Sequence, residues 1–225
     1  MVYGIAHLFL GSSLLTAALL TGGPTVVLLW PAAAFGLVGV AAVTGRPQLL
    51  GKSPLGRRSP AMTALLLPWI GPVRAWLSAS AAMSDETPWS EVADGLFMGR
   101  MARFDEMPSG ADLVVDLTAE LAADPRVIAG RTYVCVPSLD VTALSPDVLQ
   151  PLIERVAVWP GRVLIHCTQG RERSGLVMAG VLVRRGLAPD MGAAAAQIEA
   201  ARPGLELAAA RAVPTAGGTE LPEAI

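Results

Sequence analysis

The sequence has few charged residues and few cysteines for its length. Of its 225 residues, 16% are charged and 52% are hydrophobic, the mean hydropathy is +0.51, and there are two cysteines. Soluble domains carry about 25% charged residues, so this composition favours a membrane protein. The apolar content excludes a largely disordered chain, and the low cysteine count excludes a disulfide scaffold. A pI near 5.7 without a basic stripe argues against a nucleic-acid partner.

Acidic residues are absent from the first third of the chain. The first is Asp85, and residues 1–84 hold five basic side chains, whereas the remainder holds 12 basic and all 19 acidic ones. Such an asymmetry predicts two regions in different solvents. We expect residues 1–44 to form a transmembrane helical hairpin. The apolar runs 5–20 and 25–43 are each near the ~20 residues of a membrane helix, and the Thr-Gly-Gly-Pro segment 21–24 separates them.

Two other interpretations of the first apolar segment are weaker. A cleaved signal peptide would carry a positive N-terminal region, which is missing, and a second apolar stretch follows at once. Two buried core helices of a soluble protein would need a partner layer that the rest of the chain does not supply.

Residues 45–89 are expected to form a basic loop, an apolar helix and a linker. Short loops rich in lysine and arginine stay on the cytoplasmic side, so the loop places both ends of the hairpin, and the domain that follows, at the cytoplasm. The same charges make membrane lipids an expected partner, at ~1 kcal/mol per charge near anionic headgroups. The basic residues of this loop are Arg46, Lys52, Arg57 and Arg58.

Residues 61–83 are apolar but interrupted. Pro68, Gly71, Pro72 and Arg74 break the run. We expect a broken or interfacial helix on the inner leaflet. A third membrane span is the alternative, and it would carry the following domain to the other side.

Residues 90–212 have the pattern of an α/β domain. Short Val-rich runs at 111–117, 132–136 and 162–165 are typical of buried strands. Helical spacing of apolar residues alternates with them and predicts a mostly parallel central sheet flanked by helices. The expected helices cover residues 146–158, 175–185 and 191–201, and the tail 213–225 is expected to be disordered.

The motif His-Cys-x5-Arg-Ser-Gly at residues 166–175 carries the chemistry. Between a strand and a helix, the five residues after Cys167 can curl so that their N–H groups form an anion nest. The helix N-terminus adds partial positive charge, and Arg173 can donate two hydrogen bonds to phosphoryl oxygens. These groups favour the thiolate of Cys167, which is the nucleophile. In-line attack would then give a cysteinyl-phosphate intermediate.

This motif resembles the active-site loop of the protein tyrosine phosphatase superfamily, in its dual-specificity branch. Three further segments are similar to that branch, and the resemblance covers roughly residues 90–205. It implies a phosphatase that hydrolyses phosphomonoesters of lipids or proteins without a metal or other cofactor. The three segments are EVADGLFMGR at 91–100, VVDLT at 114–118, where Asp116 replaces the commoner Asn, and the Arg-Pro pair at 202–203.

The resemblance assigns roles to single residues. Asp140 is expected to be the general acid, with Asp147 as an alternative that also suits a helix first turn. Ser174 matches the hydroxyl that stabilises the leaving thiolate, and His166 matches the residue that orients the loop. A basic side chain such as Arg171 is typical of members that act on polyanionic lipids, with a solvated surface arginine as the equal alternative. Glu172 weakens the lipid interpretation, and a pair with Arg171 is its alternative role. The expected substrate-binding residues are Thr168, Gln169, Gly170, Arg171, Glu172 and Arg173.

Several alternatives stay open. A catalytically inactive phosphatase fold that binds phosphorylated membrane partners is the main one. Other Cys-loop enzymes fit less well. Low-molecular-weight phosphatases and arsenate reductases carry the Cys loop near the N-terminus, whereas here it comes late in the chain. Rhodanese-like sulfurtransferases usually lack the Arg-Ser-Gly continuation, which is present here. Cys135 is expected to be a packing residue, with a reversible disulfide to Cys167 as the alternative.

Overall fold

The computed structural model describes residues 2–84, 86–139 and 144–211. These residues form two compact units. The first comprises the described residues up to 86 together with 118–122 and 137–139, and the second comprises 87–117, 123–136 and 144–211. The boundaries predicted from the sequence, at residues 44, 89 and 212, remain predictions.

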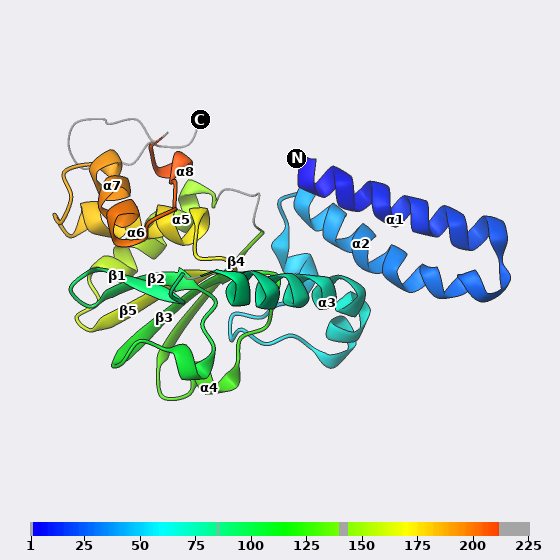
Figure 1. The fold of residues 1–225 in the computed structure, drawn as a ribbon, viewed down its shortest axis with the longest axis horizontal. Coiled ribbons are helices and arrows are strands. Elements are labelled where there is room, and N and C mark those ends of the chain that lie inside the picture. Colours follow the sequence, from blue (N-terminus) through cyan, green and yellow to red (C-terminus); the bar gives the residue numbers. More distant parts are fainter. Residues whose placement is uncertain (1, 85, 140–143, 212–225) are drawn as a thin grey trace. The chain divides into compact units, whose positions relative to one another are not determined.

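The first unit begins with two apolar helices that pack as a hairpin (Figure 1). Helix α1 covers Val2–Thr21, and α2 covers Leu29–Val43 after a short 3-10 helix, η1, at Gly23–Leu28. Gly22 and Gly23 have φ of 62° and 57°, a left-handed conformation that glycine adopts without steric cost. Both helical segments are long and apolar enough to cross a membrane. The predicted hairpin of apolar helices is therefore confirmed, whereas its insertion into a membrane remains a prediction.

Helix α1 buries small side chains and exposes large ones. Its buried residues are Gly4, Gly11 and Ala18, which recur every seven positions and so share one face. A Cβ at Gly11 would lie 2.9 Å from the backbone nitrogen of Gly36, so the two helices touch through backbone. On the outer surface Phe9 is 74% exposed and Leu20 is 81% exposed. This distribution is the reverse of that in an amphipathic helix of a soluble domain.

Basic residues after the hairpin bind backbone carbonyls. Lys52 is buried and donates from Nζ to Thr118 O at 2.6 Å. Arg58 donates to Leu50 O at 2.8 Å, Ala119 O at 2.7 Å and Glu120 O at 3.1 Å. The 3-10 helix η2 at Pro47–Leu50 and an antiparallel bridge between Lys52 and Arg58 shape this loop. Two of the four charges expected near lipid headgroups thus form hydrogen bonds within the protein, while Arg46 and Arg57 are exposed.

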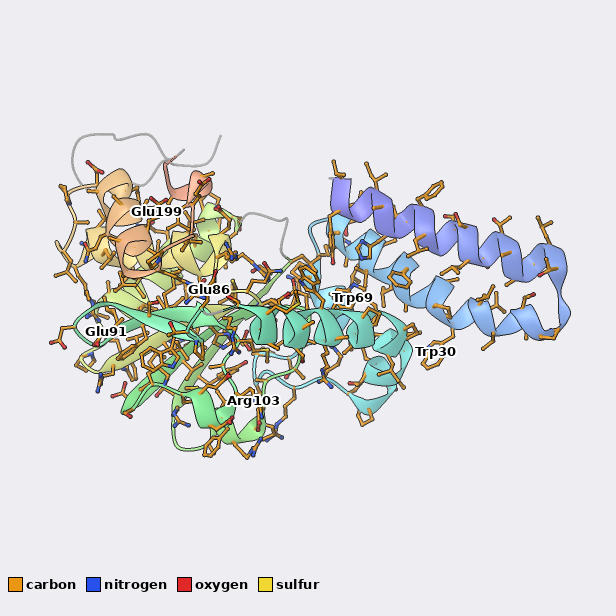
Figure 2. All side chains as sticks on the ribbon, viewed as in Figure 1. Trp30, Trp69, Glu86, Glu91, Arg103 and Glu199 are labelled. Atoms are coloured by element: carbon orange, nitrogen blue, oxygen red, sulfur yellow. The ribbon has the colours of Figure 1, made fainter. Side chains whose placement is uncertain are left out.

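Helix α3 runs unbroken over Pro60–Met83, so the predicted break at its prolines is wrong, while an interfacial position or a third membrane span stays a prediction. Pro68 has no N–H to donate to the carbonyl of Ala64, four residues earlier. The indole Nε1 of Trp30 supplies the missing donor, at 3.0 Å from Ala64 O and 3.1 Å from Leu65 O. Figure 2 shows Trp30 beside the first turns of α3, with Trp69 further along the helix. A residue on α2 therefore satisfies the carbonyl that the proline leaves free.

The second unit is built on a five-stranded sheet with the order β1-β2-β5-β3-β4 (Figure 1). Strands β2, β5 and β3 are parallel, and β1 pairs antiparallel with β2. The mostly parallel sheet predicted from the sequence is confirmed, although the β1–β2 hairpin was not predicted as such. The strands are β1 Trp89–Ala93, β2 Leu96–Arg100, β3 Ala111–Thr118, β4 Thr132–Ser138 and β5 Arg162–Cys167.

Three helices pack on one face of this sheet and enclose the main core. They are α5 at Pro146–Ala157, α6 at Glu172–Arg184 and α7 at Met191–Ala201, which agrees with the predicted helices within a few residues. The flanking helices of the predicted fold class are thus present. The short elements are η3 Phe104–Glu106, α4 Pro125–Ile128 and α8 Ala208–Arg211.

Parallel pairing brings the carboxyl ends of three strands together. Arg100 at the end of β2 is paired with Cys167 at the end of β5. Asp116 near the end of β3 is paired with His166. Ligands of parallel sheets bind beyond the carboxyl ends of the strands, and the loop that follows Cys167 begins at this edge.

Candidate active site

The Cys-x5-Arg segment forms a tight loop between β5 and α6. Cys167 is the last residue of β5, and α6 begins at Glu172. The Cys167 side chain is 1% exposed, and its Sγ accepts a hydrogen bond from the backbone N–H of Gly170 at 3.2 Å. Ser174 Oγ lies 3.5 Å from the same sulfur and donates to Arg171 O at 3.2 Å. Two polar groups from the loop and the first turn of α6 therefore converge on Cys167.

Gly170 makes this curvature possible for two separate reasons. Its φ is +71°, in the left-handed region that side chains disfavour. In addition, a Cβ at this position would lie closer than 3.0 Å to backbone atoms of Gly99 and Arg100. The loop thus packs directly on the backbone of β2, and Met101 N adds a hydrogen bond to Thr168 O at 3.3 Å.

Arg173 is buried beside the loop and is 5% exposed. Its Nη1 donates to Leu117 O at 3.3 Å, and its Nη2 donates to Thr168 Oγ1 at 3.0 Å. The contacts join the guanidinium to the end of β3 and to the first loop residue. They fix the plane of a cation that carries five N–H donors, beside the N-terminus of α6, where an anion is favoured.

A buried polar pair lies one strand away from His166. Asp116 is fully buried and accepts a hydrogen bond from Tyr133 Oη on β4 at 2.5 Å. Burial, and then the negative charge of Asp116, raise the pKa of Tyr133 well above its usual range. His166 is 3% exposed, and because it is paired with Asp116 the two side chains share a face of the sheet. The sequence did not single out Tyr133, although an aspartate within an apolar strand signals a buried partner.

The remaining loop positions have different surroundings. Gln169 and Glu172 are half-buried, and Arg171 is exposed. Arg171 Nη1 donates to Gly204 O at 3.3 Å, and Glu172 Oε1 accepts from Ala208 N at 3.3 Å. The expected substrate-binding residues 168–173 therefore form one continuous loop, and two of their side chains contact a segment that sequence reasoning had not connected with it.

Other expected residues are not brought to the loop by the described contacts. Asp140 lies outside the described residues. Asp147 is exposed in the first turn of α5. Cys135 is half-buried in β4, and no disulfide joins it to Cys167. Within residues 2–84, 86–139 and 144–211, there is no group of three or more His, Cys, Asp or Glu that could hold a metal ion.

Comparisons with known proteins find similar solved structures. No protein-family model and no curated protein matches the sequence. Human DUSP28 is 28% identical with a TM-score of 0.45, and the match covers 55% of this chain and 86% of that chain. Tk-PTP in its active form is 29% identical with a TM-score of 0.45, covering 53% and 87%.

A third similar structure is OH1 from the Orf virus, a tyrosine phosphatase with triple substrate specificity. It is 17% identical with a TM-score of 0.44, and the match covers 62% of this chain and 92% of that chain. In its motifs and in these structures, the chain is similar to the dual-specificity and tyrosine phosphatases.

Proposed function

We propose that the protein is a membrane-anchored phosphatase that hydrolyses phosphomonoesters of phospholipids or phosphoproteins. The convergence of polar groups on Cys167 carries the proposal. Gly170 N–H and Ser174 Oγ lie 3.2 and 3.5 Å from Sγ, and the buried guanidinium of Arg173 stands at the start of the same helix. The N–H of Gly170 donates to the sulfur and stabilises its anionic form, and a fixed guanidinium suits two phosphoryl oxygens.

The first chemical step is attack of the Cys167 thiolate on phosphorus. The S–P bond forms while the bond from phosphorus to the leaving oxygen breaks, and Asp140 gives its proton to that oxygen. Negative charge on the phosphoryl oxygens is held by the backbone N–H groups of residues 168–172 and by Arg173. His166 orients the loop from the end of β5.

The second step releases inorganic phosphate. Water attacks phosphorus, the S–P bond breaks, and the electron pair returns to sulfur as thiolate. The Asp140 carboxylate takes a proton from the water, and the Ser174 hydroxyl stabilises the departing thiolate. Each group thus ends in its starting state, and no cofactor is consumed.

The N-terminal hairpin supports the anchoring part of the proposal. A helix that buries Gly4, Gly11 and Ala18 and exposes Phe9 and Leu20 gains little from folding in water. In lipid the same arrangement is favourable, because small residues allow close helix contact and large apolar residues face the hydrocarbon. The basic loop after the hairpin favours a cytoplasmic position for the catalytic domain.

Acid-quenched labelling tests the chemistry directly. Full-length protein in detergent is mixed with a 32P-labelled aryl phosphate, and label retained on the chain is counted together with phosphate release. We expect label and turnover in the wild type and in Cys135→Ser, which removes the other thiol, and neither in Cys167→Ser. Turnover by Cys167→Ser would refute the mechanism.

The alternative, a catalytically inactive phosphatase fold that binds phosphorylated partners, predicts a different result in the same experiment. It predicts no release by the wild type, while a phosphorylated lipid or peptide still binds. A parallel panel of phosphopeptides and phospholipid monoesters separates protein from lipid substrates. Asp140→Asn should slow hydrolysis of a substrate with a poor leaving group more than hydrolysis of an activated aryl phosphate. Equal slowing of both would indicate that another residue is the general acid.

A further inference from the structure

The charged side chains of Arg171 and Glu172 belong to the loop sequence but contact the end of the chain. Residues 204–210 follow the Arg-Pro pair at 202–203, and we call them the C-terminal strap. Arg171 Nη1 donates to Gly204 O, and Glu172 Oε1 accepts from Ala208 N, both at 3.3 Å. Two adjacent loop side chains of opposite charge thus hold two backbone groups of the strap.

Apolar packing holds the strap in the same place. Leu205 is 5% exposed and Leu207 is 1% exposed, and both belong to the main core. Leu207 lies against Gly175 in the first turn of α6, where a Cβ would be closer than 3.0 Å to its side chain. Its backbone N–H also donates to Glu199 Oε1 on α7 at 2.8 Å. The strap therefore links the first turn of α6 to α7.

The loop depends on the position of Arg171. The carbonyl oxygen of Arg171 accepts from Ser174 Oγ at 3.2 Å and from Gly175 N at 2.8 Å. Ser174 Oγ is the group that lies 3.5 Å from Cys167 Sγ. A shift of Arg171 would therefore move a hydroxyl next to the nucleophile, and small misplacements are costly in catalysis.

We propose that Arg171 and Glu172 are positioning residues that hold the C-terminal strap against the loop, and that their side chains do not contact the substrate. The inference rests on the proposed phosphatase function. The substrate is then bound by the backbone N–H groups of the loop and by Arg173, which together fit one phosphoryl group. The adjacent charges of Arg171 and Glu172 sum to zero, so they add no net attraction for a second phosphate. The substrate class is a single phosphomonoester rather than a headgroup with several phosphates.

Steady-state kinetics on two lipids test the assignment. A phosphatidylinositol monophosphate and a phosphatidylinositol bisphosphate, in mixed micelles, are compared for Arg171→Ala, Glu172→Ala and the conservative variants Arg171→Lys and Glu172→Gln. We expect each alanine variant to lower kcat about fivefold on both lipids, the effect of one lost hydrogen bond, with the ratio of the two KM values unchanged. Lysine keeps a donor and glutamine keeps an acceptor, so these variants should restore most of kcat.

Two changes in KM would overturn the inference. The first is a KM that rises for the bisphosphate alone in Arg171→Ala. The second is a KM that falls for the bisphosphate in Glu172→Gln. Either result would show that the side-chain charges contact the substrate.

Amide hydrogen exchange provides a readout that does not need turnover. We expect faster exchange at residues 168–172 and 204–208 in both alanine variants than in the wild type. A chain that ends at Arg211 keeps every described contact of the strap and should match the full chain. Unchanged exchange and unchanged kcat in the alanine variants would contradict the inference while leaving the phosphatase intact. A wild type that releases no phosphate would instead contradict the proposed function.

Discussion

Replacing Gly170 by alanine tests whether the loop conformation sets the activity. The left-handed backbone alone costs a non-glycine residue about 1–2 kcal/mol. The new Cβ would also lie closer than 3.0 Å to backbone atoms of Gly99 and Arg100, which cannot move aside as a flexible side chain can. The loop must therefore shift away from β2, and a shift of about 1 Å at a catalytic group costs about 100-fold. We expect kcat/KM for an aryl phosphate to fall by at least that factor.

Gly186→Ala is the matched control for this experiment. Gly186 has nearly the same φ, +69°, but a Cβ there would meet nothing within 4 Å. Gly186→Ala should lose about 1–2 kcal/mol of stability in thermal unfolding, and Gly170→Ala should lose more because of the added backbone contact. Only Gly170→Ala should lose activity per folded molecule. Wild-type phosphate release by Gly170→Ala, or an equal loss in both variants, would refute the argument that contact with β2 shapes the loop.

Three further changes test other parts of the structure. Burial acts to raise the pKa of Glu106, but hydrogen bonds from Arg100 and a backbone N–H outweigh it and hold that pKa below its ordinary value. Glu106→Gln should therefore cost about 1 kcal/mol at pH values above the ordinary glutamate pKa of about 4.3. The difference should shrink as the pH falls through the lower pKa of the folded state, in urea unfolding at a series of pH values. Gly11→Leu should overpack the helix hairpin and lower its stability in detergent by about 1–3 kcal/mol. Arg58→Met removes the donors to three carbonyls and should cost about 2–3 kcal/mol in thermal unfolding of the full chain.

The strands and the loop could be predicted because their signals are local. An apolar, Val-containing run of four to seven residues already specifies a buried strand, and Cys167 and Arg173 are separated by a spacing that suits one loop before a helix. Helix α3 shows where local rules fail. Proline normally ends a helix, yet the carbonyl freed by Pro68 is satisfied by Trp30, 34 residues away from Ala64 in the sequence. No property of residues 61–83 contains that information.

The parts of the site that escaped prediction are contacts between distant segments. Tyr133 and Asp116 lie on neighbouring strands, and only the strand order places the phenol against the carboxylate. The strap carries no motif of its own, and its leucines resemble those of any apolar turn. Glu172 was weighed for its effect on substrate charge, whereas in the structure it accepts a hydrogen bond from the backbone N–H of Ala208. Charge patterning alone could not identify that contact.

The contact between Gly170 and β2 explains how the ion pair between Arg100 and Glu106 can affect the loop. Gly170 packs on the backbone of Gly99 and Arg100, so the path of β2 at its carboxyl end limits where the loop can lie. The Arg100 side chain is held by Glu106, with Nη1 at 3.0 Å from Oε2 and Nη2 at 2.8 Å from Oε1. Glu106 also accepts from Arg103 N at 2.9 Å, which closes the turn after β2. The ion pair therefore stabilises the surface on which the loop rests, and its loss should reach Cys167 through backbone packing rather than through charge.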